Sequence, residues 1–149
     1  MKRLLIFLAP LIFLTACQTY SEDDKKSFDK EIQTYLDKEG IDCERSSSGL
    51  YYKIIEPGVG ELIKYQDKVQ FTYKGTLLDG TVFDEQLEEP VEFNVRELIG
   101  AWKEIMLELR EGGKAFLVAP PQLGYGDREL EDIPANSILV FEMEVIAVK

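Results

Sequence analysis

The last two-thirds of the chain is dominated by short segments in which apolar and polar residues alternate. Residues 69–75 place three large apolar side chains on one face and polar side chains on the other. This period of two predicts a β-strand with one buried face. Residues 50–55, 114–119 and 137–148 have the same strand character, and Asp79-Gly80 marks a hairpin turn. Together these segments predict an antiparallel sheet with one side buried.

One stretch inside this strand-rich region switches to helical spacing. Residues 96–109 carry apolar side chains at steps of three and four, which predicts a helix with one buried face. Asn94 and Glu97 form a capping pair at its start, and Gly112-Gly113 follows its end. The predicted architecture is therefore an α+β fold in which one helix packs on an antiparallel sheet.

A further helix is predicted ahead of the sheet, over residues 21–38. Ser21 occupies the N-cap position, acidic residues fill the first turn, and Gly40 lies just past the end. Its apolar stripe consists of Phe28, Ile32, Tyr35 and Leu36. This stripe predicts docking against the following domain, with self-association as the alternative. Residues 44–49, which contain three consecutive serines, are interpreted as a polar linker.

The N-terminus has the layout of an export signal. Lys2-Arg3 precedes the apolar run 4–14, which is too short to span a bilayer comfortably. The next motif, Leu14-Thr15-Ala16-Cys17, resembles the lipobox of bacterial lipoproteins, in which cleavage before the cysteine leaves it to carry acyl chains. We therefore expect a signal peptide (1–16), a lipidated extension (17–48) and a folded domain (49–149). An ordinary cleaved signal peptide and an uncleaved anchor are the alternatives.

Charge and missing residue types argue against several functions. Loss of Lys2 and Arg3 with the signal changes the formal charge from −11 to −13, which disfavours nucleic acid as a partner and leaves the acyl chains as the membrane attachment. The chain has no histidine, which is the usual proton shuttle of nucleophilic sites and the commonest nitrogen ligand of zinc. We expect no metal or other cofactor. With Cys17 acylated, Cys43 has no intramolecular disulfide partner.

A collinear series of motifs relates the strand-rich domain to a known family. In chain order these motifs are Tyr73-Lys74-Gly75, Asp79-Gly80, Phe83-Asp84, Leu98-Ile99, Trp102, Leu123-Gly124-Tyr125-Gly126, Ile133-Pro134 and Leu139-Val140-Phe141. From about residue 49 to the C-terminus the series resembles the FKBP-type peptidyl-prolyl cis-trans isomerases. The resemblance implies a curved antiparallel β-sheet wrapped around one α-helix, preceded here by an N-terminal helical extension.

The resemblance also implies an aromatic active-site pocket. Its implied catalytic residues are Tyr73, Phe83, Asp84 and Tyr125. Its implied substrate-binding residues are Trp102 as the floor, Leu98 and Ile99 as an aliphatic wall, Phe141, Val91 and the backbone N–H of Ile133. The loop 127–136 forms a flap in this reading. Without the whole motif series, the same aromatic residues would be interpreted as ordinary core.

Two positions near the pocket rim depart from the family pattern. Val91 stands where many relatives have an aromatic residue. The loop 85–89 lacks the arginine that often partners the pocket aspartate. Both departures bear on ligand preference more than on the fold.

The leading hypothesis is an isomerase that acts on X-Pro bonds of cell-envelope proteins, with proline-containing polypeptides as substrates. One alternative is a proline-binding chaperone with little catalysis. Another, suggested by the helical extension, is an inactive FKBP-like lipoprotein that docks into an envelope protein complex. The order of lipobox, extension and domain also resembles that of the gliding-motility-associated FKBP-type lipoproteins. Gln18 after the lipobox cysteine favours the outer membrane as the site of anchoring.

Overall fold

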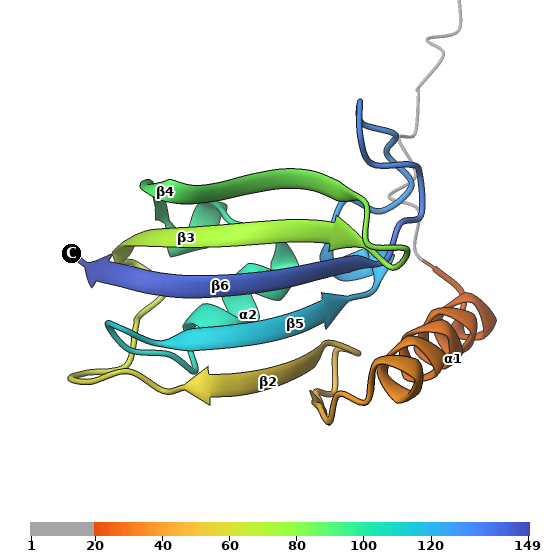
Figure 1. Ribbon diagram of the computed structural model, residues 1–149, viewed down its shortest axis with the longest axis horizontal. Helices are drawn as coiled ribbons and strands as arrows, with labels where there is room; N and C mark the ends of the chain where they lie inside the picture. The colour runs from red at the N-terminus through yellow and green to blue at the C-terminus, as the bar shows by residue number, and fades with distance from the viewer. Residues whose placement is uncertain (1–19) are drawn as a thin grey trace, which may run out of the picture.

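The computed structural model describes residues 20–149, which form a six-stranded sheet with one helix on either side (Figure 1). The helices are α1 (Glu22–Glu39) and α2 (Gly100–Met106), and the strands are β1 (Glu44–Arg45), β2 (Tyr51–Glu56), β3 (Lys68–Leu77), β4 (Val82–Asn94), β5 (Lys114–Ala119) and β6 (Leu139–Val148). The spatial order is β1-β2-β5-β6-β3-β4, and all neighbours are antiparallel. The predicted α+β fold is confirmed.

The main core lies between the sheet and α2, which sits behind the sheet in Figure 1. Alternate residues of the central strands point into it, among them Val69 and Phe71 of β3 and Phe141 of β6. All three are almost fully buried. The predicted strands at 69–75, 114–119 and 137–148 and the hairpin at Asp79-Gly80 are present. The first and last alternate because successive side chains of a strand point to opposite faces, whereas 114–119 is buried on both faces.

Helix α1 begins and ends where its capping residues predict. The Ser21 Oγ accepts a hydrogen bond from the Asp24 N–H at 3.1 Å, and the Asp24 carboxylate accepts one from the Ser21 N–H at 3.0 Å. Gly40 closes the other end in the left-handed conformation, with φ of 67°. These reciprocal bonds satisfy backbone donors that the first turn would otherwise leave free.

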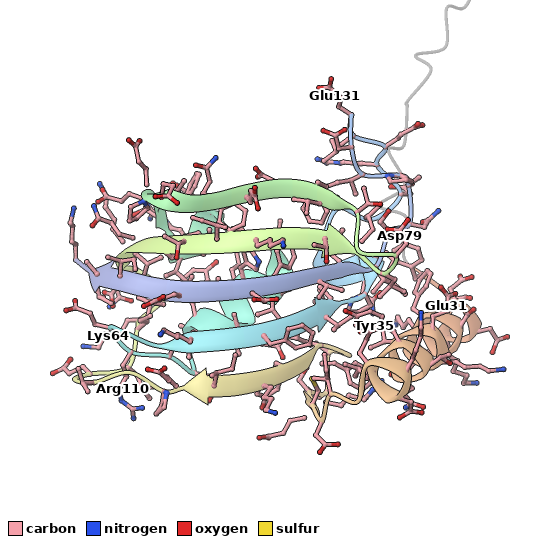
Figure 2. All side chains as sticks on the ribbon, in the orientation of Figure 1. Glu31, Tyr35, Lys64, Asp79, Arg110 and Glu131 are labelled. Atoms are coloured by element: carbon pink, nitrogen blue, oxygen red, sulfur yellow. The ribbon has the colours of Figure 1, made fainter. Side chains whose placement is uncertain are left out.

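The apolar stripe of α1 docks on the second face of the sheet. Ile32 and Leu36 are buried against an apolar cluster that also contains Phe116 and Val140. Figure 2 shows Tyr35 on the side of the helix that faces the sheet. Docking, rather than self-association, is thus what the stripe does within this chain. One end of the second sheet face is covered as well, so the expectation of a sheet buried on one side only is wrong.

The predicted helix at 96–109 is much shorter in the structure. Residues Val95–Glu97 form a 3-10 turn, and Leu98 and Ile99 are extended before α2 begins at Gly100. The Asn94 side chain makes no capping hydrogen bond. Apolar residues at steps of three and four correctly predicted which side chains are buried. Burial, however, does not require a continuous helix. A chain that turns twice places the same side chains in the core.

Two segments interpreted as irregular are strands at the edges of the sheet. Residues 44–45, placed in the polar linker, form β1 and pair with β2. Residues 85–89, placed in a loop, belong to β4. Both segments are exposed, so their pairing rests on backbone hydrogen bonds and leaves no apolar alternation in the sequence. Between Phe71 and Tyr73 the register with β4 slips, from Val91 to Gln86.

The N-terminal predictions lie outside the described residues, since the signal sequence and Cys17 precede residue 20. Within residues 20–149 no helix combines the length and the apolar character needed to cross a membrane. Cys43 is a half-buried free thiol.

Candidate active site

An aromatic cavity of about 360 Å³ opens on the α2 side of the sheet. Its lining residues come from β3, β4, β6, the segment from the 3-10 turn Val95–Glu97 into α2, and the loop after a second 3-10 turn, Pro121–Leu123. They are Tyr73, Phe83, Asp84, Phe93, Glu97, Leu98, Ile99, Trp102, Tyr125 and Phe141. The structure therefore brings together every residue predicted for the pocket except Val91 and Ile133. The cavity is mostly apolar, with carboxylates and tyrosine hydroxyls as its polar groups.

Trp102 is the hub of the aromatic cluster. Its ring lies 4.8 Å from that of Tyr73 and 5.0 Å from that of Phe141, both edge to face. Phe83 meets Phe141 in the same way, at 5.6 Å and 90°. Edge-to-face contacts favour the ring quadrupoles and hold each ring in one orientation. The walls of the cavity are consequently fixed before any ligand arrives.

Gly75 makes room for one of these rings. A Cβ at this position would lie 2.5 Å from Cζ of Phe83 and 3.0 Å from Cε1 of Phe141. Such separations are far below van der Waals contact, so any larger residue would displace the Phe83 ring. The glycine of the Tyr73-Lys74-Gly75 motif therefore shapes the cavity although its own atoms contribute no chemistry.

The polar groups of the cavity centre on Asp84. The Tyr73 hydroxyl donates a hydrogen bond of 2.5 Å to Asp84 Oδ2. Burial and the hydrogen bond to Asp84 together raise the pKa of Tyr73 well above its usual value. Burial, and secondarily the charge of Asp84, raise the pKa of Tyr125 as well. Both tyrosines are therefore protonated at neutral pH and available as hydrogen-bond donors.

Two donors at the cavity have no partner among residues 20–149. The Tyr125 hydroxyl makes no hydrogen bond with another described side chain or backbone group, and the buried indole N–H of Trp102 is also unpaired. Unpaired buried donors are uncommon in folded proteins. Tyr125 is half-buried in the cavity wall, where its O–H can reach a carbonyl oxygen of a bound polypeptide. Within the described part of the chain, no group of three His, Cys, Asp or Glu side chains could hold a metal ion.

Val91 and Ile133 lie outside the cavity lining. Val91 is half-buried in β4 and packs on the main core. Ile133 is buried in the same core, and its N–H points to the carbonyl oxygen of Leu130 at 3.3 Å. The β4 side chains that line the cavity are instead Phe83, Asp84 and Phe93, and Phe93 is 46% exposed.

Phe93 and Glu97 line the cavity but were not expected from the sequence. Neither residue belongs to the motif series. The signal for Phe93 was its two-residue offset from Val91, since residues two apart on a strand share a face. Glu97 had been interpreted as half of a helix capping pair, and no pattern in the sequence places it at the site.

The predicted flap loop, residues 127–136, stands up beyond the end of the sheet, and Figure 2 marks its tip at Glu131. Its base is closed by a hydrogen bond of 2.8 Å from the Asn136 N–H to the Gly126 carbonyl oxygen. A second hydrogen bond, from the Tyr20 hydroxyl to Asn136 Oδ1 at 2.7 Å, ties this base to the N-terminal extension.

Comparison with known proteins points to one family. The family model described as FKBP-type peptidyl-prolyl cis-trans isomerase matches residues 60–146. The isomerase FkpA of Escherichia coli is 41% identical over 129 residues, which cover 85% of this chain and 47% of that protein. A probable FKBP-type isomerase of Haemophilus influenzae is 42% identical over 112 residues, 73% of this chain and 46% of that protein. The chain thus spans about half the length of the curated relatives it matches.

Solved structures give the same answer. The crystal structure of FkpA from Escherichia coli superimposes with a TM-score of 0.74 at 39% identity, covering 86% of this chain and 62% of that chain. A peptidyl-prolyl isomerase structure from Pseudomonas syringae gives 0.70 at 27% identity, covering 89% of this chain and 99% of that chain. The resemblance found in the motif series is confirmed, and the chain belongs to the FKBP-type peptidyl-prolyl cis-trans isomerase family.

Proposed function

We propose that this chain is a peptidyl-prolyl cis-trans isomerase that acts on X-Pro bonds of polypeptides, with the aromatic cavity above Trp102 as its active site. The observation that carries the proposal is the cavity itself. It is preformed and lined largely by rings, and it contains the Tyr73–Asp84 hydrogen bond and a Tyr125 hydroxyl that no residue in 20–149 engages. Membership of the family supports the same activity.

The chemistry follows from the peptide bond. Partial double-bond character gives rotation a barrier of roughly 18–20 kcal/mol. At the twisted state amide resonance is lost, so charge separation between the imide nitrogen and oxygen falls. A cavity that excludes water therefore binds the twisted imide better than the planar one, and catalysis consists of this difference in binding. Proton transfer has no part in this mechanism.

Each predicted site residue has a role in this mechanism. Tyr73, Phe83, Trp102 and Phe141 surround the proline ring, while Leu98 and Ile99 form an aliphatic wall. Asp84 orients the Tyr73 hydroxyl, and Tyr125 donates to a substrate carbonyl oxygen. For Ile133 we propose the same donor role, which requires its N–H to exchange the weak bond to Leu130 for one to substrate. Val91 acts indirectly, by supporting the β4 rim beside Phe93.

The test is the exchange rate of a proline tetrapeptide measured by NMR with residues 18–149. We expect acceleration at micromolar protein. Asp84→Ala should lower kcat/KM at least tenfold, about 1.4 kcal/mol of transition-state stabilisation, and Tyr125→Phe should lower it several-fold. The matched control is Asp37→Ala, the same change at an exposed position on α1, which should leave the rate intact. Absence of acceleration by the unmodified protein would end the proposal.

We further propose that the protein is anchored in the bacterial cell envelope through acyl chains on Cys17, after removal of residues 1–16, and that its substrates are envelope proteins. The lipobox-like sequence supports this anchoring, and Gln18 favours the outer membrane. Growth of the producing bacterium with labelled palmitate should label the full chain, and Cys17→Ser should abolish the label. Cys43→Ser is the control for thiol-linked incorporation; a label that survives Cys17→Ser would contradict the anchor.

A further inference from the structure

A second hollow of about 640 Å³ lies directly beside the catalytic cavity. Ile99 and Tyr125 line both spaces, so the two are contiguous. Its far side is formed by the N-terminal extension, through Tyr20 and Lys25, and the remainder by the segment that follows β5. The extension therefore contributes to a surface next to the active site, in addition to covering the second face of the sheet.

The wall made by the extension is held in place. The Tyr20 hydroxyl donates to Asn136 Oδ1 at 2.7 Å, and its ring packs edge to face on Phe28 with centroids 5.3 Å apart. Asn136 in turn closes the base of the flap loop through Gly126. The hollow is thus bounded on two sides by segments that are linked to each other.

The charged residues that line this hollow are both basic. They are Lys25 and Arg128, whereas the charged residues of the catalytic cavity, Asp84 and Glu97, are both acidic. This contrast occurs in a chain with a formal charge of −11. The charged lining of the hollow is therefore basic, while burial, together with the nearby carboxylates of Asp127 and Asp24, raises the pKa of the Tyr20 hydroxyl at its edge.

Both cations are available to a ligand. Arg128 is exposed and forms no ion pair with another residue in 20–149. Lys25 pairs with Glu22 at 2.7 Å, but their side chains are 39% and 79% exposed. An ion pair this exposed contributes little free energy, so Lys25 can exchange Glu22 for an anionic group in the hollow.

We propose that the second hollow binds the part of the polypeptide substrate next to the proline, and that Lys25 and Arg128 select an acidic side chain there. This inference rests on the proposed isomerase function. An extended chain advances about 3.3 Å per residue, so a polypeptide with its proline over Trp102 reaches the adjoining hollow within a few residues. The occupant is the substrate itself, because the hollow continues the cavity that holds the proline.

The experiment is NMR exchange on a panel of peptides that carry one Phe-Pro bond and differ at one position. Glu, Gln or Lys is placed at each position up to four residues before or after the proline. We expect kcat/KM for Glu to exceed that for Lys roughly three- to tenfold, as two exposed ion pairs allow, at positions on one side of the proline only. The preference should shrink in about 1 M salt, which shortens the Debye length to roughly 3 Å.

Substitutions at the two basic residues test whether they cause the preference for a Glu-containing peptide. Arg128→Glu should abolish or invert the Glu-over-Lys ratio, and Lys25→Gln should reduce it about twofold. Lys38→Glu changes the charge of the same helix at an exposed position outside the hollow and should retain the ratio. The peptide panel is measured on the unmodified protein. The test of an acidic preference therefore does not depend on whether either variant folds.

The two proposals fail in different ways. Equal kcat/KM for Glu, Gln and Lys at every position, with acceleration present, would overturn the second hollow as a substrate site and leave the isomerase proposal standing. A ratio that persists in Arg128→Glu and Lys25→Gln would overturn the assignment to these residues. Absence of acceleration with any peptide would overturn the isomerase function itself.

Discussion

One helix packs on each face of the sheet, α2 on the main core and α1 on one end of the other face, but only the α2 face carries the candidate site. Helix α1 has 18 residues, is capped at both ends, and buries Ile32 completely against the sheet. Helix α2 has only seven residues, and beside it the rings of the sheet and of Trp102 enclose a cavity of about 360 Å³. The strands thus contribute to a small packed cluster under the long helix α1 on one face, and to both the main core and a binding site beside the short helix α2 on the other.

The difference teaches that the aromatic residues alone do not make the site. Phe116 on the α1 face and Phe141 on the α2 face are both buried. They differ in what lies opposite. Phe116 faces the apolar stripe of α1, whereas Phe141 faces a cluster of edge-to-face rings with an open rim. Changes on the α1 face should therefore alter stability alone, whereas changes at the residues that line the cavity on the α2 face should also alter catalysis.

The largest expected effect is on stability, at the α1 face. Ile32→Ala removes a fully buried side chain and should lower the free energy of unfolding by about 2–5 kcal/mol, as measured by urea denaturation. Glu31→Ala, at the exposed neighbouring position, should change it by less than about 0.5 kcal/mol. If the two faces are independent, kcat/KM per folded Ile32→Ala molecule should stay within about twofold; a larger drop would show that they are coupled.

The next effect belongs to the cavity. Gly75→Ala places a methyl group 2.5 Å from the present position of the Phe83 ring, so the ring must move into the space intended for proline. We expect kcat/KM to fall about tenfold or more, or about 1.4 kcal/mol. Thr76→Ala, one residue further along β3, is the control. Unchanged activity in Gly75→Ala would mean that Phe83 does not define the active geometry.

A smaller effect is expected at the start of α1. Ser21→Ala removes the hydroxyl that caps the helix and should lower the free energy of unfolding by about 1 kcal/mol. Ser47→Ala, an exposed serine after β1, should have little effect in the same denaturation experiment. Equal stabilities for the two variants would show that the capping box contributes nothing measurable.

The smallest expected effect is that of pH. The pKa values of Tyr73 and Tyr125 are raised in the folded protein, so both hydroxyls stay protonated at neutral and mildly alkaline pH. With no histidine in the chain, kcat/KM should be flat from about pH 6 to 9. Above about pH 10 the tyrosines of the unfolded chain lose their protons before Tyr73 and Tyr125 of the folded chain do. The contribution of these two hydroxyls to the free energy of unfolding is therefore complete below about pH 10 and is lost as the pH rises through their raised pKa values.

The sequence predicted those parts of the fold that carry a local signal. Alternation marked β3 and β6, a short apolar run before Pro120-Pro121 marked β5, and the caps at Ser21 and Gly40 marked α1. The full extent of the edge strand β4 was not predicted, because most of its residues are exposed on both faces of the sheet and its sequence shows no alternation of apolar and polar residues. The sequence did not predict that α2 is short. Apolar spacing indicates which residues are buried, and residues of the 3-10 turn and of the extended segment before Gly100 are buried without being part of the helix.

The candidate site likewise contains residues that the sequence predicted and residues that it did not. Tyr73, Asp84 and Trp102 were predictable because the motif order fixes where the family fold places them. Phe93 lies outside every motif, and its contribution depends on the register of β4. The second hollow could not be predicted from the sequence, since it depends on where α1 docks relative to the flap loop, and this is set by contacts between residues more than a hundred positions apart.

The central claim is that the cavity accelerates rotation about an X-Pro bond by binding the twisted imide, without proton transfer. The most direct measurement is kcat/KM for one Leu-Pro tetrapeptide by NMR exchange, in H₂O and in D₂O. We predict clear acceleration at micromolar protein and rates in the two solvents that agree within about twofold, since no proton moves at the rate-limiting step. No acceleration, or a several-fold slowing in D₂O, would contradict the claim.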